Sequence, residues 1–143
     1  MNNDTINLLK ECNSGCKSAV NGIDQVLPYI RDEKLRSTVT NEKKIHQEIG
    51  DRCHQILNSY GADERDPHPA AKVFSWVGTE VKLAVNSSTQ EIAGIMADGC
   101  NMGIKSVAKY LNQYKDATPE SRTIAAHIIN TEHDFMKDML VFL

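Results

Sequence analysis

A seven-residue phrase occurs twice in this chain: CNSGCKS begins at Cys12, and CNMGIKS begins at Cys100. The two copies match at five of the seven positions and start 88 residues apart. A second pair of segments repeats at nearly the same separation, because HQEI at His46 is followed 87 residues later by HDFM at His133. Self-similarity at a fixed separation is the sequence signature of a repeated structural unit. The chain is therefore expected to fold as two related halves.

Apolar residues recur at helical spacing in both halves, and no alternating strand pattern competes with them. This periodicity predicts four long helices, at about 5–27, 32–60, 88–114 and 118–143. It also predicts one short helix, at about 70–85. Asp4, Ser88 and Thr118 are expected to cap helix starts, with Ser88 and Glu91 forming a capping box. Pro28 removes a backbone donor and is expected to end or bend the first helix.

Each copy of the repeated phrase lies on the first helix of a predicted helical hairpin. A single domain over residues 1–143 is expected, with hairpin one at 4–60, a crossover carrying the short helix at 61–87, and hairpin two at 88–143. Two related hairpins joined by a long connection make a four-helix bundle with one crossover. The predicted fold class is therefore all-α, a ferritin-like four-helix bundle with a short extra helix in the crossover connection.

With these motifs the chain resembles the uncharacterised ferritin-like bundle proteins of bacteria, a domain-of-unknown-function family whose hairpins carry a Cys-x-x-Gly-Glu type motif. The resemblance covers nearly the whole chain. It implies a metal site held by Glu on helices one and three and by Glu-x-x-His on helices two and four. Here Cys16 and Ile104 stand where the motif places Glu, and neither partner helix carries Glu-x-x-His. These degenerate ligand motifs predict that the bundle lacks an intact di-iron centre.

Several metal-ligating side chains fall on or beside the apolar faces of the predicted helices. A helix turns by about 100° per residue, which places Glu42 and His46 inside the apolar arc of the second helix and Glu132 inside that of the fourth. Cys16 is central to the stripe of the first helix, and His133 lies at the edge of the fourth. Hairpin turns near residues 29 and 117 would bring Cys16, Glu42, His46, Glu132 and Gly103 to one level of the bundle.

Two inward carboxylates cannot stay charged and unpaired in a dry core, so something must satisfy them. A metal is one solution, because thiolate, imidazole and carboxylate ligands suit zinc or iron. The candidate ligands are Glu42, His46, Glu132, Cys16 and His133. A hydrogen-bonded network of Glu, His and trapped water is the other solution, and it needs no cofactor. The cysteines have two interpretations as well, as small hydrophobic residues or as reactive thiols.

The composition of the chain limits the classes of binding partner and the cellular compartment that we expect. The net charge is −3 and the charges are mixed along the chain, so no basic stripe predicts nucleic-acid binding. The first residues lack the pattern of a signal peptide, and no apolar run approaches the length of a membrane span. We therefore expect a cytoplasmic protein with reduced thiols and no membrane partner.

With Phe74 and Trp76, the short helix has more large apolar side chains than a single face packed against the bundle would bury. They predict either a cover across one end of the bundle or the interface of a homodimer. Two functional hypotheses follow from the sequence. The first is a non-catalytic binding or interaction protein, and the alternative is a metal-binding protein or metal-dependent oxidoreductase with an altered mid-bundle site.

Overall fold

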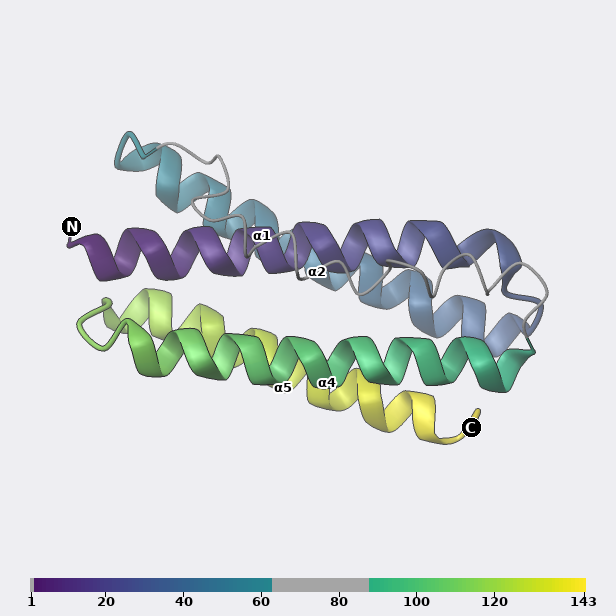
Figure 1. Cartoon of the computed structure of the whole chain (residues 1–143). Coiled ribbons are helices and arrows are strands. Elements are labelled where there is room, and N and C mark those ends of the chain that lie inside the picture. The colour runs from purple at the N-terminus through teal and green to yellow at the C-terminus, as the bar shows by residue number, and fades with distance from the viewer. Residues whose placement is uncertain (1, 63–87) are drawn as a thin grey trace.

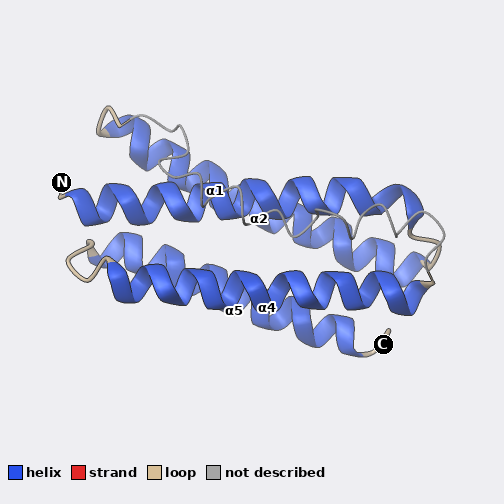
Figure 2. Cartoon of the chain, viewed as in Figure 1, coloured by secondary structure: helices blue, strands red, loops and turns tan. Residues whose placement is uncertain are grey.

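The computed structural model describes residues 2–62 and 88–143. Within these two segments the chain is all-α: four long helices, one short 3-10 helix and no strand (Figure 2). The elements are α1 (Asn3–Val26), η1 (Leu27–Tyr29), α2 (Glu33–Ser59), α4 (Thr89–Gln113) and α5 (Pro119–Leu140) (Figure 1). The all-α prediction is confirmed. The short helix expected at 70–85, with Phe74 and Trp76, lies outside the described residues.

The start of α1 differs from the prediction. Asn2, not Asp4, caps the helix: its Oδ1 accepts a hydrogen bond from the backbone N–H of Thr5 at 2.8 Å. Asn2 has the extended backbone of an N-cap residue, whereas Asp4 already lies in the first helical turn. The Asp4 carboxylate instead accepts a hydrogen bond from the backbone N–H of Asp116 at 2.9 Å. This bond ties the start of α1 to the turn between α4 and α5.

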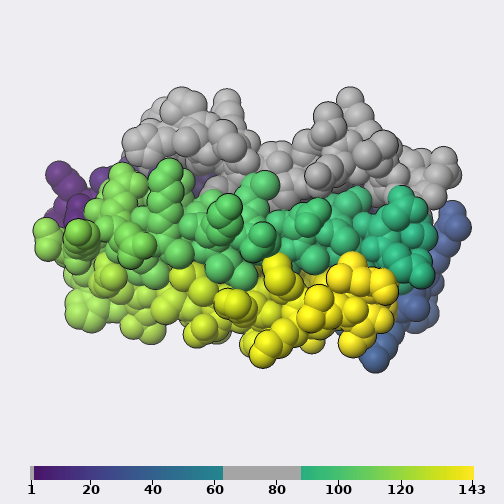
Figure 3. All heavy atoms as spheres, turned by 60° about the horizontal axis from the view of Figure 1, so that its bottom comes forward, coloured from purple at the N-terminus to yellow at the C-terminus, as the bar shows by residue number. Residues whose placement is uncertain are grey.

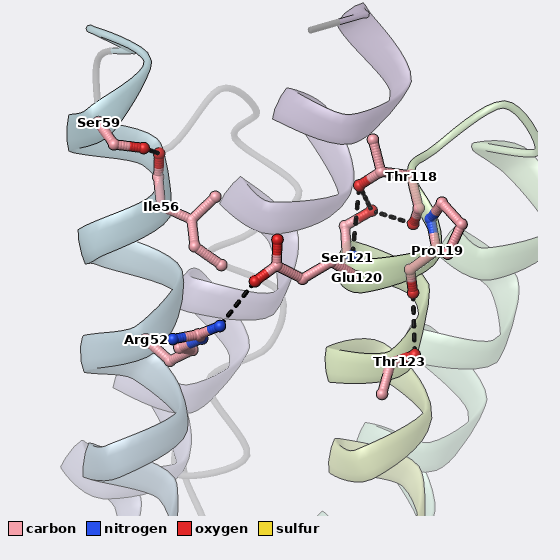
Figure 4. Close-up of polar contacts among 8 residues, drawn as sticks. All are labelled: Arg52, Ile56, Ser59, Thr118, Pro119, Glu120, Ser121 and Thr123. Atoms are coloured by element: carbon pink, nitrogen blue, oxygen red, sulfur yellow. Dashed lines mark hydrogen bonds and ion pairs between the residues drawn. The ribbon is translucent and has the colours of Figure 1, made fainter.

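The starts of α4 and α5 are as the sequence predicts. Ser88 and Glu91 form the expected capping box at the start of α4. Thr118 caps α5, and Pro119 occupies its first turn, where a missing N–H costs nothing (Figure 4). Pro28 lies in η1, which separates α1 from α2.

The helices form two antiparallel hairpins, α1 with α2 and α4 with α5 (Figure 1). Contacts are most extensive within each hairpin, while α1 also contacts α4 and α5, and α2 contacts α5. The end of α2 and the start of α4 lie at opposite ends of the bundle, so α2 and α4 run in the same direction. In the space-filling view, α4 and α5 together cover one face along its length (Figure 3).

The core is divided into two apolar clusters. One lies toward η1 and includes Ile23, Val26, Leu35, Met96 and Phe135. The other lies toward the α4–α5 turn and includes Leu8, Leu9, Leu57, Val107 and Ile128. Glu42 and His46 of α2 and Thr131 and Glu132 of α5 lie between these clusters in sequence, so a polar layer separates the two halves of the core. None of the helices in the described segments has the length and apolar character needed to cross a bilayer.

Candidate functional site

Three ionisable side chains form the centre of this polar layer. Glu42 and His46 extend from α2 and Glu132 from α5, with exposures of only 4%, 1% and 3%. Their inward direction agrees with the helical phase of the sequence. The two α2 residues lie one turn apart on the same face of their helix.

Both ring nitrogens of His46 are engaged. Its Nδ1 lies 2.8 Å from the backbone carbonyl oxygen of Glu42. A carbonyl oxygen can only accept, so Nδ1 carries a hydrogen and donates it. Its Nε2 is hydrogen-bonded to Glu132 Oε1, which joins α2 to α5 across the bundle. The two bonds fix both the position of the ring and its orientation.

A single proton lies in the contact between His46 Nε2 and Glu132 Oε1. It belongs either to an imidazolium facing a carboxylate or to a carboxylic acid facing a neutral imidazole, and the pair has no net charge in either form. Burial lowers the pKa of His46, but its hydrogen bond to Glu132 and the charge of that carboxylate outweigh burial. The pKa of His46 therefore lies above its ordinary value of 6.5.

Glu42 is the second titrating group of the layer. Its Oε2 lies 3.8 Å from His46 Nδ1, too far for a hydrogen bond, and is buried without a hydrogen-bond partner. Burial raises the pKa of Glu42 to about 7, with His46 opposing and Glu132 adding to the shift. Glu42 therefore gains or loses a proton near neutral pH, where an unperturbed glutamate is fully charged.

Helix α4 completes the layer. A Cβ placed on Gly103 would lie 3.4 Å from Glu132 Oε2, so the glycine faces that carboxylate. The two residues therefore lie at the same level of the bundle. Glu132 Oε2 is also buried without a hydrogen-bond partner. Burial and the charge of Glu132 raise the pKa of the Cys100 thiol. Beside Gly103, His46 and Glu132 lies a cavity of about 10 Å³, at the lower limit of the space for one water molecule.

Two of the predicted site residues, Cys16 and His133, form no hydrogen bond with this centre. Cys16 is buried on α1, where burial, Cys53 and Glu132 all raise the pKa of its thiol. His133 is exposed, although the repeat pairs it with His46. The bonded partner of His46 is Glu132, 86 residues away, and buried positions of α2 and α5 repeat at this separation, as Ile49 and Phe135 illustrate. Buried positions that correspond in α2 and α5 are thus 86 residues apart, one fewer than the 87 residues of the sequence repeat.

The five side chains predicted as ligands are not gathered around one point. Within residues 2–62 and 88–143, no group of three or more His, Cys, Asp or Glu residues is placed to hold a metal ion. The metal assignment from sequence therefore stays a prediction, and the geometry shows a hydrogen-bonded His–Glu pair in its place. All four cysteines are buried and free.

Sequence reasoning missed several further buried polar residues, among them Glu11 and Asn13 on α1. Glu11 is 3% exposed, and its carboxylate is hydrogen-bonded to Tyr110 of α4. Burial and the charge of Glu11 raise the pKa of Tyr110 to about 12. Asn13 is also 3% exposed. Asn13 follows Leu9 by four residues and precedes Cys16 by three, so a helical projection would have placed it on the apolar stripe, whereas Glu11 lies two residues from Leu9 and off that stripe.

Comparison with known proteins gives a structural likeness. No family model matches the chain, and no curated protein does. The crystal structure of a DUF305 fragment from Deinococcus radiodurans has a similar fold, with a TM-score of 0.78 over 98% of this chain and 95% of that chain. The two sequences are 14% identical, so the likeness concerns the helical fold alone and says nothing about activity.

Proposed function

We propose that this chain is a ferritin-like bundle that acts as a binding or interaction protein, not as an oxidoreductase. The observation that carries this proposal is the engagement of both His46 nitrogens, Nδ1 by the Glu42 carbonyl and Nε2 by Glu132. An imidazole binds a metal through a nitrogen lone pair. Neither nitrogen offers one while these bonds are in place.

The composition of the layer supports the same proposal. Di-iron sites of the ferritin type take a carboxylate from each of the four helices. At this level α1 presents Cys16 and α4 presents Gly103, which leaves Glu42 and Glu132 as the two carboxylates of the layer. The residues therefore do not fit a di-iron centre. The four buried, free cysteines are compatible with the cytoplasmic location that we propose.

Metal content tests this proposal directly. Untagged protein purified without chelator is expected to carry no stoichiometric zinc or iron by elemental analysis, and chelator should leave its free energy of unfolding unchanged. Ferrous iron should be oxidised in its presence no faster than in a protein-free control. A near-stoichiometric metal, or iron oxidation clearly above the control, would overturn the proposal.

A second candidate function, a metal-binding protein or metal-dependent oxidoreductase, is favoured by one specific observation. Glu42 Oε2 and Glu132 Oε2 are both buried without hydrogen-bond partners. A cation such as zinc or iron would satisfy both oxygens. In that case His46→Ala should release the metal, and chelator should destabilise the wild-type protein but not the variant.

We also propose that the chain forms a homodimer, which depends on Phe74 and Trp76 in the segment outside the described residues. Light scattering during size exclusion at micromolar concentration tests this proposal. A clean monomer of 15.9 kDa would refute it.

A further inference from the structure

An open groove of about 350 Å³ lies between α1 and α2. Those lining residues that the structure describes all belong to these two helices, which pack side by side (Figure 1). The volume falls in the range of small-molecule sites in proteins. The groove borders the polar layer, because His46 lines both the groove and the small internal cavity.

The buried part of the lining is largely apolar. It contains Cys16 and the His46 ring, with the half-buried Val20 and Gly50 beside them. Both nitrogens of His46 are bonded elsewhere, so this ring offers the groove its carbon atoms. A Cβ on Gly50 would lie 3.4 Å from Cys16 Cβ, so the glycine lets α1 and α2 approach closely here. This floor suits a hydrocarbon group.

Asn13 is the one polar group in the described floor that lacks a partner. Its side chain reaches toward α2, with Oδ1 3.6 Å from the position of a Cβ on Gly50. The residue is 3% exposed, and its amide forms no hydrogen bond with the described part of the chain. The polar atoms of this amide are not among the enclosed, unpartnered ones, so the amide opens into the groove, where it can hydrogen-bond to a ligand.

The rim carries charges of both signs. Lys17 on α1 and Asp51 on α2 are exposed, line the groove, and form no ion pair in the described segments. Asp24, in contrast, is already paired with Lys43 at 2.6 Å. In the described part of the rim, Lys17 is therefore an available cation and Asp51 an available anion, contributed by opposite helices.

We propose that this groove binds a small zwitterion with an apolar body, that is, a free aliphatic α-amino acid. Lys17 attracts its carboxylate, Asp51 attracts its ammonium group, and the side chain covers the floor at Cys16 and Val20. Asn13 hydrogen-bonds to the charged end, because its amide can donate to a carboxylate and accept from an ammonium. This inference rests on the proposed binding function and names its ligand class.

Three matched compounds test the inference by titration calorimetry: leucine, 3-methylbutylamine and 4-methylpentanoate. The amine and the acid each keep the hydrocarbon of leucine but only one of its charges. Leucine is expected to bind with millimolar or better affinity, and each analogue more weakly by about fivefold, the scale of one exposed ion pair. An absence of leucine binding, or equal binding of either analogue, would overturn the inference.

Variants locate the site. Asn13→Leu, which keeps the size of the side chain, should weaken leucine binding by about tenfold, because a buried hydrogen bond to a charged group is lost. Lys17→Gln and Asp51→Asn change exposed residues, and each should weaken binding by about fivefold. The exposed charges Lys44 and Asp134 lie outside the groove lining, so Lys44→Gln and Asp134→Asn are matched controls that should leave binding unchanged.

The outcomes separate this inference from the proposed function. Metal-free protein that does not bind leucine would refute the inference alone. Protein with stoichiometric metal would refute the proposed function, whatever its affinity for leucine. If Asn13→Leu fails to fold by circular dichroism, the two rim variants still decide the result, and unchanged binding in both would overturn the inference.

Discussion

Two ionisable pairs join α2 to α5, each formed by a basic side chain of α2 and a glutamate of α5, and their surroundings are opposite. His46 and Glu132 meet in the core, where their side chains are 2% and 4% exposed. Arg52 and Glu120 meet at the surface at 2.6 Å, with exposures of 58% and 55% (Figure 4). In the core the charges interact strongly and their desolvation is costly, whereas at the surface water screens them. The buried pair therefore constrains how α2 and α5 fit together, while the exposed pair adds little to the stability of the contact.

The largest expected effect comes from removing one partner of each pair. Glu132→Ala leaves His46 Nε2 unpaired in the core and should lower the free energy of unfolding by about 3–5 kcal/mol. Glu120→Ala should lower it by less than about 1 kcal/mol. Urea denaturation measures both. Glu132→Gln is the matched control, because its amide keeps a hydrogen bond, and it should be tolerated better than Glu132→Ala. Equal losses for Glu132→Ala and Glu120→Ala would contradict the comparison.

The pH dependence should be the next largest effect. The pKa of Glu42 is about 7 in the folded chain against an ordinary 4.5, so the native state binds more protons between these values. The pKa of His46 is also raised, so its stabilisation is complete below pH 6.5 and is lost as pH rises through the higher native value. Both contributions have the same sign. Stability should therefore fall by up to about 3 kcal/mol between about pH 5 and pH 8.

Matched variants identify the source of this slope. Glu42→Gln should flatten the dependence measured by urea denaturation at several pH values, because the amide does not titrate. Glu120→Gln, at the exposed pair, should leave the slope as it is in the wild type. A slope that Glu42→Gln leaves unchanged would show that Glu42 is already charged throughout this window in the folded protein.

A double-mutant cycle sharpens the comparison further. Replacing both His46 and Glu132 with Leu removes the unpaired partner together with the bond, so the double variant should lose less stability than the two single losses added together. We expect a coupling energy of about 2 kcal/mol for this pair and about 0.5 kcal/mol or less for Arg52→Ala with Glu120→Ala. Additive losses at His46 and Glu132 would mean that the buried contact is not formed in solution.

Salt should produce the smallest effect. Raising the ionic strength to about 1 M shortens the screening length to about 3 Å and should remove the coupling between Arg52 and Glu120. The coupling between His46 and Glu132 should persist, because solvent ions do not enter the core. The same two cycles measured at low and high salt provide the test. A salt-sensitive buried pair would indicate that water reaches it.

Much of the fold follows from local signals. The capping box at Ser88 and the Thr118–Pro119 start of α5 agree with the structure because capping depends on neighbours three or four residues apart. The cap of α1 was assigned wrongly because Asn2 and Asp4 are both good capping residues, and only the contact of Asp4 with Asp116 separates their roles. Glu11 was missed because it lies off the apolar stripe of its own helix. Its partner Tyr110 belongs to the other hairpin, which no local pattern reveals.

The helices and the inward direction of Glu42, His46 and Glu132 follow from the amino-acid sequence, because the helical turn of about 100° per residue fixes which side of its own axis a residue faces. Which of these groups touch depends on how the helices pack. The repeat pairs His46 with His133, but the packed helices pair it with Glu132 and leave His133 exposed. A shift of one residue changes the height by about 1.5 Å and the direction by about 100°, enough to exchange a buried partner for an exposed one. That offset between two helices depends on how their side chains interdigitate, and the pattern of a single helix does not contain it.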